Sequence, residues 1–261
     1  MPGRFATALA TAALLGALPA RAIDPFEIQV YGPDIDAPGE PSLELHLNFT
    51  WDGQGAPAPG ALPALHAGHY TLEAALGALD WLELGAYLQT LSAPGFGFRY
   101  AGFKLRAKMV VPRRVTGAFF LGLNVEVGRV PSLVEPSAWS LELRPILGWS
   151  DDWLYVAVNP IFDLALAAPD PLRLDLGPCA KAEVNTQVGF GVGLEYYAEL
   201  GFLDAVGAPS QWQQVLFLAL DLLSPHGGEE SPWELNLGVG RGLTAATPQQ
   251  WIAKVIAGRS F

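Results

Sequence analysis

The sequence predicts an all-β fold, a transmembrane antiparallel up-and-down β-barrel of about twelve strands, with ten or fourteen as alternatives. In the segment Ser42 to Thr50, apolar and polar side chains alternate strictly, which on a strand places each kind on its own face. The pattern recurs along the chain up to Phe261. Hydrophobic residues make up 51% of the chain, yet after the N-terminus no uncharged apolar run reaches the roughly 18 residues that a membrane helix needs.

The first 22 residues predict a cleaved signal peptide. Arg4 supplies the positive start, residues 8–18 the apolar core, and residues 20–22 an A-x-A cleavage site. The apolar core is too short to span a membrane, so we expect export and a mature chain that begins at Ile23.

Residues 23–40 precede the first predicted strand and are acidic and rich in Pro and Gly. The sequence leaves open whether they form a periplasmic strap or a partial plug inside the barrel. Asp34, Asp36 and Glu40 are possible cation ligands, but an acidic Pro/Gly linker explains them better. Residues 41–261 form the predicted barrel domain.

Each predicted strand is a run of alternating apolar and polar residues bounded by turn-forming residues. The expected strands are 41–50, 68–77, 81–91, 97–110, 116–128, 138–149, 153–165, 178–188, 190–201, 212–222, 232–241 and 250–261. Short turns belong on the periplasmic side and long loops outside. The long connections expected outside are 51–67, 129–137, 166–177, 202–211 and 242–249. The connection 223–232 breaks this rule, because it should be periplasmic but is long.

Tryptophans occur at the ends of the predicted strands, where they would form the aromatic girdles of a membrane barrel. These residues are Trp81, Trp139, Trp149, Trp153, Trp212, Trp233 and Trp251, and Trp51 lies just beyond a strand. The alternative is a soluble β-sandwich with these rings in its core, but core residues would not collect at strand ends.

Extending the alternation places Lys104, Arg106 and Lys108 on one face, which must be the lumen. A Lys or Arg facing lipid near mid-membrane costs about 2–4 kcal/mol. The lumen-lining candidates are Glu44, His46, Glu73, Glu83, Lys104, Arg106, Lys108, Glu126, Glu142, Arg144, Asp163, Lys181, Glu183, Glu195 and Glu199. The same argument turns Asp221, Glu234 and Lys254 inward.

Two interpretations of this lumen remain open. In the first, Lys104, Arg106 and Lys108 form a basic ladder opposite Glu195 and Glu199 in a narrow channel. In the second, charges pair across neighbouring strands, for instance Glu83 with Lys104 or Arg106, and largely close the bore. A twelve-stranded barrel lies between the filled and the water-filled sizes, so the strand number does not decide between them.

The sequence predicts no catalytic, metal or cofactor site. His46 and Asn48 share a face, but Ser42 is the only serine on that strand and lies about 13 Å away at 3.3 Å per residue. His66 and His69 form an H-x-x-H pair without a clear third ligand. Cys179 is the only cysteine, so no internal disulfide forms, and the net charge of −11 argues against nucleic acid as a partner.

Several segments resemble one family of bacterial outer-membrane barrels. They are IDPFEIQVY, PGEPSLELHLNFT, ALDWLELGAYL, YAGFKLRAKMV, WELNLGVGRGLT and WIAKVIAGRSF. Members are described as channels, including proteins linked to phenol-degradation pathways, and the resemblance covers nearly the whole mature chain. It also implies that a last strand ending in Phe261 is an assembly signal, although Arg259 and Ser260 stand where Tyr-Arg is common.

We therefore expect an outer-membrane, porin-like passive channel for small solutes in a Gram-negative bacterium, without enzymatic activity. Its expected partners are outer-membrane lipid and lipopolysaccharide, the barrel-assembly machinery and small solutes. A closed structural or adhesion barrel with functional extracellular loops is the alternative, and an outer-membrane hydrolase is the third.

Overall fold

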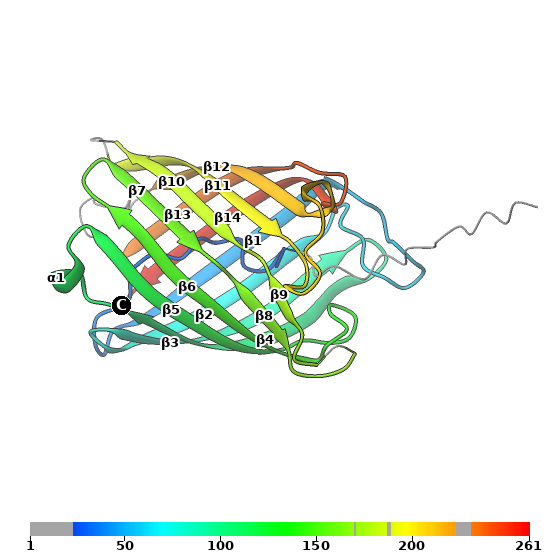
Figure 1. Ribbon diagram of the computed structural model, residues 1–261, viewed down its shortest axis with the longest axis horizontal. Coiled ribbons are helices and arrows are strands. Elements are labelled where there is room, and N and C mark those ends of the chain that lie inside the picture. Colours follow the sequence, from blue (N-terminus) through cyan, green and yellow to red (C-terminus); the bar gives the residue numbers. More distant parts are fainter. Residues whose placement is uncertain (1–22, 170, 187–188, 223–230) are drawn as a thin grey trace, which may run out of the picture.

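The strands of the computed structural model form a closed antiparallel barrel (Figure 1). The structure describes residues 23–169, 171–186, 189–222 and 231–261, so the predicted signal peptide lies outside the described residues. The strands are β1 (Pro41–Gly53), β2 (Gly68–Leu79), β3 (Leu82–Ala93), β4 (Gly97–Val110), β5 (Phe119–Arg129), β6 (Trp139–Ser150), β7 (Leu154–Asn159), β8 (Phe162–Ala165), β9 (Leu174–Leu176), β10 (Cys179–Asn185), β11 (Phe190–Glu199), β12 (Gln213–Leu222), β13 (Trp233–Gly242) and β14 (Gln249–Ser260).

These fourteen segments make a wall of twelve strands, which confirms the predicted fold and strand number. β7 and β8 both pair with β6 and are separated by Pro160, which has no N–H for the ladder. β9 pairs with β8 and β10 pairs with β7, and Pro178 lies between β9 and β10. β7 and β8 therefore make one strand of the wall, β9 and β10 make another, and each of these strands is interrupted near a proline.

The ring is closed by β1 with β14 and by β5 with β6. Closure pairs the backbone groups along both sides of each strand, as hydrocarbon surroundings require. The register keeps the alternation in phase, so Leu45 lies opposite Ala257 on the outer face and His46 opposite Ile256 on the inner face. Outward leucines such as Leu105 and Leu218 are 58% and 61% exposed.

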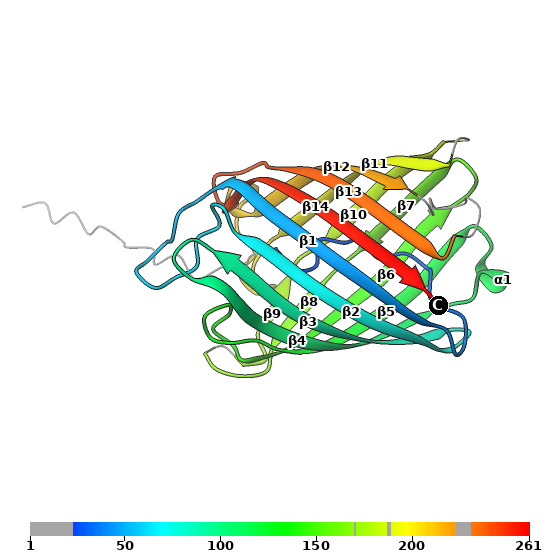
Figure 2. The same cartoon turned by 180° about the vertical axis from the view of Figure 1, so that it is seen from behind.

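The two ends of the barrel differ in their connections (Figure 2). The loop end carries the connections 54–67, 94–96, 130–138, 166–173, 200–212 and 243–248. The opposite end, here called the turn end, carries the first residues of β1, the end of β14 and the short helix α1 (Arg113–Thr116). The 3-10 helix η1 (Pro209–Gln211) is part of a loop-end connection. No helix among the described residues is long and apolar enough to cross a membrane.

At the turn between β6 and β7, Asp151 accepts hydrogen bonds from the Trp149 indole and from the amides of Trp153 and Leu154. These bonds hold the pKa of this exposed carboxyl below its usual range, with the Trp149 bond the largest cause. Asp151 thus shapes a turn, as such residues commonly do.

Three sequence predictions about the strands need correction. The connection expected at 166–177 contains β9, whose three residues are too few to show alternation. The strand expected at 153–165 is interrupted at residues 160–161, and the one expected from residue 116 begins at Phe119 because α1 precedes it. Most of the anomalous connection 223–232 lies outside the described residues.

Candidate functional site: the lumen and its N-terminal segment

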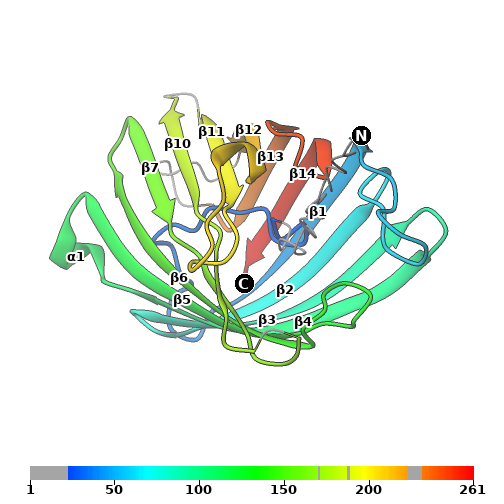
Figure 3. The same ribbon diagram turned by 45° about the vertical axis from the view of Figure 1, so that its right-hand side comes forward.

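Residues 23–40, here called the N-terminal segment, run through the interior of the barrel (Figure 3). Phe26 packs edge-on against His69 at the start of β2, near the loop end. Gly39 and Glu40 exchange backbone hydrogen bonds with Gly77 near the turn end. The segment therefore crosses the lumen lengthwise, and its first described residues lie toward the loop end.

Side chains of the wall hold the segment by its backbone. Asn48 Nδ2 donates to Pro25 O at 2.8 Å, Thr71 Oγ1 to Phe26 O at 2.9 Å and Lys254 Nζ to Ile28 O at 3.2 Å. Among the described residues, the backbone–backbone bonds from the segment to the wall are those at Gly77. The segment is thus bound through side chains along most of its length and does not extend the sheet.

Further along the segment, two other wall residues hydrogen-bond to its backbone. Asn159 bonds both backbone groups of Tyr31, at 2.7 Å to N and 3.1 Å to O, and Lys108 Nζ donates to Asp34 O at 2.6 Å. Each of these wall groups would need a new partner if the segment left, since a buried polar group without a hydrogen bond is costly.

The lumen around residues 26–31 of the segment is packed like a protein core. Ile28, Val30 and Tyr31 of the segment are buried against inward side chains of the wall. The wall residues of this cluster include Phe120, Ile146, Tyr155, Ala157, Cys179, Tyr197, Val215, Phe217 and Ile252. A second buried cluster joins Phe26 to Ala67, Leu91, Ala93 and Ala101. A void of about 10 Å³ lies between Ile23, Ile28 and this part of the wall.

The segment also brings its own charge. Glu27 is 3% exposed and lies 3.2 Å from Lys104 Nζ and 3.3 Å from Arg144 Nη1. Tyr31 donates its hydroxyl hydrogen bond to Glu27 at 2.5 Å, and the Arg144 guanidinium lies 4.4 Å from the Tyr31 ring centroid. One buried carboxylate thus links two cations of the wall to the segment.

Thirteen of the fifteen lumen candidates are buried, and Glu44 and Asp163 are half-buried. Many of their charges pair with neighbours: Arg106 of β4 contacts Glu83 of β3 at 2.7 Å, whereas Arg144 contacts Glu142 on its own strand, β6, at 2.7 Å. Lys104 also lies 3.1 Å from Glu126. The structure therefore shows the cross-strand pairing that the second lumen interpretation describes.

On the opposite wall, Lys254 Nζ lies 2.5 Å from Glu195, and Lys181 lies 2.8 Å from Glu183 and 2.5 Å from Asp221. Glu199 accepts a hydrogen bond from the amide of Gly201. Carboxylates on this wall, such as Glu195, thus pair with Lys181 and Lys254 of the same wall. Lys104, Arg106 and Lys108 on the facing wall have other partners.

The turn-end half of the lumen holds a cavity of about 750 Å³, here called the vestibule. The segment lines it from Gln29 to Ala37, and the wall contributes charged residues from β1–β4 and β10–β14. Among the described lining residues, nine carry carboxyl groups and five are Lys or Arg. The vestibule is therefore polar and acidic, unlike the packed region around residues 26–31.

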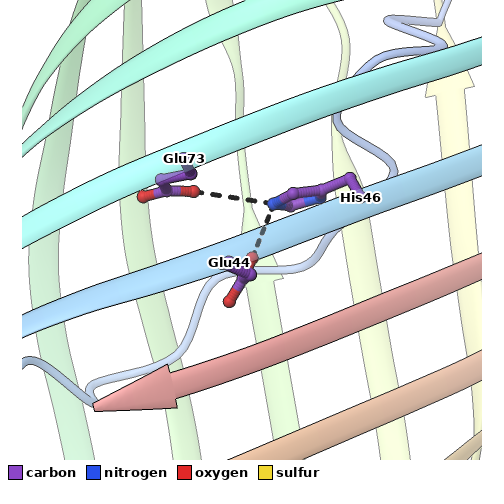
Figure 4. Close-up of side chains that lie close together, drawn as sticks. All are labelled: Glu44, His46 and Glu73. Atoms are coloured by element: carbon purple, nitrogen blue, oxygen red, sulfur yellow. Dashed lines mark ion pairs between the residues drawn. The ribbon is translucent and has the colours of Figure 1, made fainter. Parts of the chain in front are cut away.

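Beside the vestibule, His46 lies between two carboxylates (Figure 4). Its Nε2 is 2.6 Å from Glu44 Oε1 and 3.5 Å from Glu73 Oε2. Arg106 of β4 contacts the other oxygen of Glu73. The hydrolase interpretation needs a hydroxyl nucleophile beside His46, but its near partners here are acidic.

The other histidine candidates lie apart from this cluster. His66 is exposed in the first loop, and His69 packs on Phe26. The sequence did not single out Glu73 as a partner of His46. The two residues meet through the β1–β2 register, which pairs Glu44 with Glu73.

The tryptophans form two rows on the outside of the wall. Following the strand directions, one row lies near the loop end and one near the turn end. The loop-end row is Trp51, Trp139, Trp212 and Trp251, and the turn-end row is Trp81, Trp149, Trp153 and Trp233. Trp51 and Trp251 stack at 5.8 Å across β1 and β14. Phe261 is 62% exposed, and its amide bonds Pro41 O at 2.9 Å.

Comparison with solved structures shows what kind of barrel this is. The COG4313 outer membrane channel from Pseudomonas putida F1 superposes with a TM-score of 0.63 at 12% identity, over 90% of this chain and all of that one. The chain has the fold of an outer-membrane channel barrel. The KdgM porin, also solved with disordered oligogalacturonate, superposes with a TM-score of 0.54 over 84% of this chain and 99% of its own. No family model and no curated protein matches the sequence.

Proposed function

We propose that this chain is a Gram-negative outer-membrane barrel that acts as a narrow passive channel for small solutes. The apolar outer face between two tryptophan rows suits a bilayer, and the polar inner face suits water. The channels and porins among similar folds support the same function. In this proposal residues 1–22 direct export, residues 23–40 are a partial plug, and residues 41–261 are the barrel.

The observation that carries the proposal is the vestibule of about 750 Å³, which ends at the packed part of the N-terminal segment. Because the segment fills the lumen there, solute passage requires its displacement. The segment is bound by side chains and not by a strand ladder, so its displacement leaves the twelve-stranded wall intact. The wall then supplies the pore, and the segment limits its opening.

The lining charges predict the selectivity of this pore. The described residues of the vestibule carry more carboxyl than basic groups. Rings of acidic side chains favour cations in pores, so we expect a mild cation preference.

Single-channel recording of the folded chain from Ile23 to Phe261 in a planar bilayer under a salt gradient tests the proposal. Discrete current steps with a cation-selective reversal potential are expected. Insertion shown by heat-modifiable migration, together with no current at any voltage, would overturn the channel and support the second candidate. That candidate is a closed structural or adhesion barrel, and the packing of Ile28 and Tyr31 in the lumen favours it.

The remaining parts of the proposal concern partners and catalysis. Phe261 at the end of β14 would be read by the barrel-assembly machinery, and the outer face would contact lipid and lipopolysaccharide. We propose no catalytic activity, because carboxylates surround the imidazole of His46 and the similar structures named above are channels.

A further inference from the structure

We propose that His46, Glu44 and Glu73 form a binding site for one divalent first-row transition-metal ion, such as Zn²⁺, inside the barrel. The ligand atoms of the three side chains all lie within 4.8 Å of one another. They offer one imidazole nitrogen and two carboxylate oxygens, a donor set that Zn²⁺ and related ions bind in proteins.

The imidazole itself is the strongest sign of a ligand. His46 has no exposed surface, and its Nε2 lies 2.6 Å from Glu44 Oε1 and 3.5 Å from Glu73 Oε2. One imidazole nitrogen and two carboxylate oxygens that converge in this way are the ligand types that a bound metal ion holds together. Nε2 points between two carboxylates, where a cation would be bound (Figure 4).

The spacing of the donors also fits. In a tetrahedral Zn²⁺ site with bonds near 2.0–2.1 Å, neighbouring ligand atoms lie about 3.3 Å apart. The separation of 3.5 Å between His46 Nε2 and Glu73 Oε2 matches this value. The separation of 2.6 Å to Glu44 needs only a small rotation of a half-buried side chain.

Neighbouring groups prepare the carboxylates for this role. Arg106 contacts Oε1 of Glu73, which leaves Oε2 directed toward His46. Gln29 of the N-terminal segment donates to Glu44 Oε1 at 3.4 Å. Hydrogen bonds of this kind orient metal-binding carboxylates and tune their affinity.

The charge balance favours a cation. With His46 neutral, as metal binding requires, the carboxylates of Glu44, Glu73 and Glu83 face the single guanidinium of Arg106. The next cation, Lys108, donates to the segment at Asp34 O. A divalent ion would therefore offset the acidic excess, and it could enter through the vestibule that Glu44 and Glu73 line.

The test is a Zn²⁺ titration of the folded chain from Ile23 to Phe261 in detergent, against a chromophoric chelator and after removal of metal with EDTA. We expect one tightly bound Zn²⁺ per barrel. His46→Gln and Glu73→Gln should each weaken binding more than about tenfold, since loss of even an outer hydrogen-bond partner costs about 10–100-fold. His66→Gln changes an exposed loop histidine and should bind like the parent protein.

Zn²⁺ X-ray absorption on the parent protein gives a second readout that needs no variant. Nitrogen and oxygen neighbours at about 2.0–2.2 Å are expected, without sulfur at about 2.3 Å. Absence of stoichiometric binding, equal binding by His46→Gln, or a sulfur neighbour from Cys179 would each overturn the site. These readouts do not depend on conductance, so a negative result would overturn the metal site without testing the channel proposal.

Discussion

Two regions of the lumen are enclosed by the same twelve strands but are filled in opposite ways. In the packed region, Ile28 and Tyr31 of the N-terminal segment lie among apolar wall residues such as Phe217 and Tyr155. In the vestibule, the segment borders an acidic cavity of about 750 Å³ near the turn end. Strand number alone therefore does not set the bore of this barrel, because the same wall encloses both regions and the packing of the segment differs between them.

The difference also locates the restriction. Charged wall residues surround the vestibule, yet ion pairs with other wall residues hold them against the wall. Apolar residues of the segment fill the packed region. In the proposed channel we therefore expect the barrier to solutes between Phe26 and Tyr31 and the selectivity in the vestibule.

Deletion of residues 23–35 should have the largest effect. It removes the packed part of the segment and keeps residues 36–40, which hold the turn end through Gly77 and through the Ser260–Asp36 hydrogen bond of 2.7 Å. We expect single-channel conductance to rise severalfold. An unchanged conductance in a correctly inserted barrel would show that the wall itself is the barrier.

Phe217→Ala should have the next largest effect, because it opens a cavity in the packed region of the lumen. Phe217 is 1% exposed and meets Tyr197 edge-on at 5.7 Å. Loss of a buried Phe side chain costs about 3–5 kcal/mol, measured as the free energy of unfolding in lipid vesicles. Leu218→Ala, the adjacent outward residue, is the matched control and should cost less. Equal losses would mean that the lumen around Phe217 is not packed as a core.

Glu27→Gln should loosen the segment without removing it. The change replaces a carboxylate that meets Lys104 and Arg144 by a neutral amide. A hydrogen bond to a charged group contributes about 1.5–3 kcal/mol, so amide hydrogen exchange in residues 26–31 should accelerate about 10–100-fold. Glu40→Gln, at an exposed position of the same segment, should leave that exchange unchanged. Equal protection in both variants would contradict the anchoring role of Glu27.

Glu40→Lys should have the smallest effect, confined to the vestibule. Glu40 lines the vestibule and is exposed, so the reversed charge is well screened. We expect the reversal potential under a salt gradient to move toward zero while conductance changes little. A shift toward stronger cation preference would contradict the assignment of selectivity to the vestibule.

Much of the wall could be predicted from the sequence, because alternation is local. Lys104, Arg106 and Lys108 could be assigned to one face from their spacing alone, and the register keeps them there. The path of the N-terminal segment could not be predicted, since FEIQVY alternates like a strand but finds its partners on distant strands. Glu73 joined His46 only through a register that no local pattern specifies.

Side-specific labelling of a cysteine in the vestibule tests whether the N-terminal segment blocks the lumen. In a Cys179→Ala background, Ser42→Cys places a single thiol at a half-buried position that lines the vestibule. With the barrel inserted in one orientation, a small charged thiol reagent should modify it quickly from the turn end and slowly from the loop end. Deletion of residues 23–35 should abolish that difference. Equal rates from both ends with the segment in place would contradict the account.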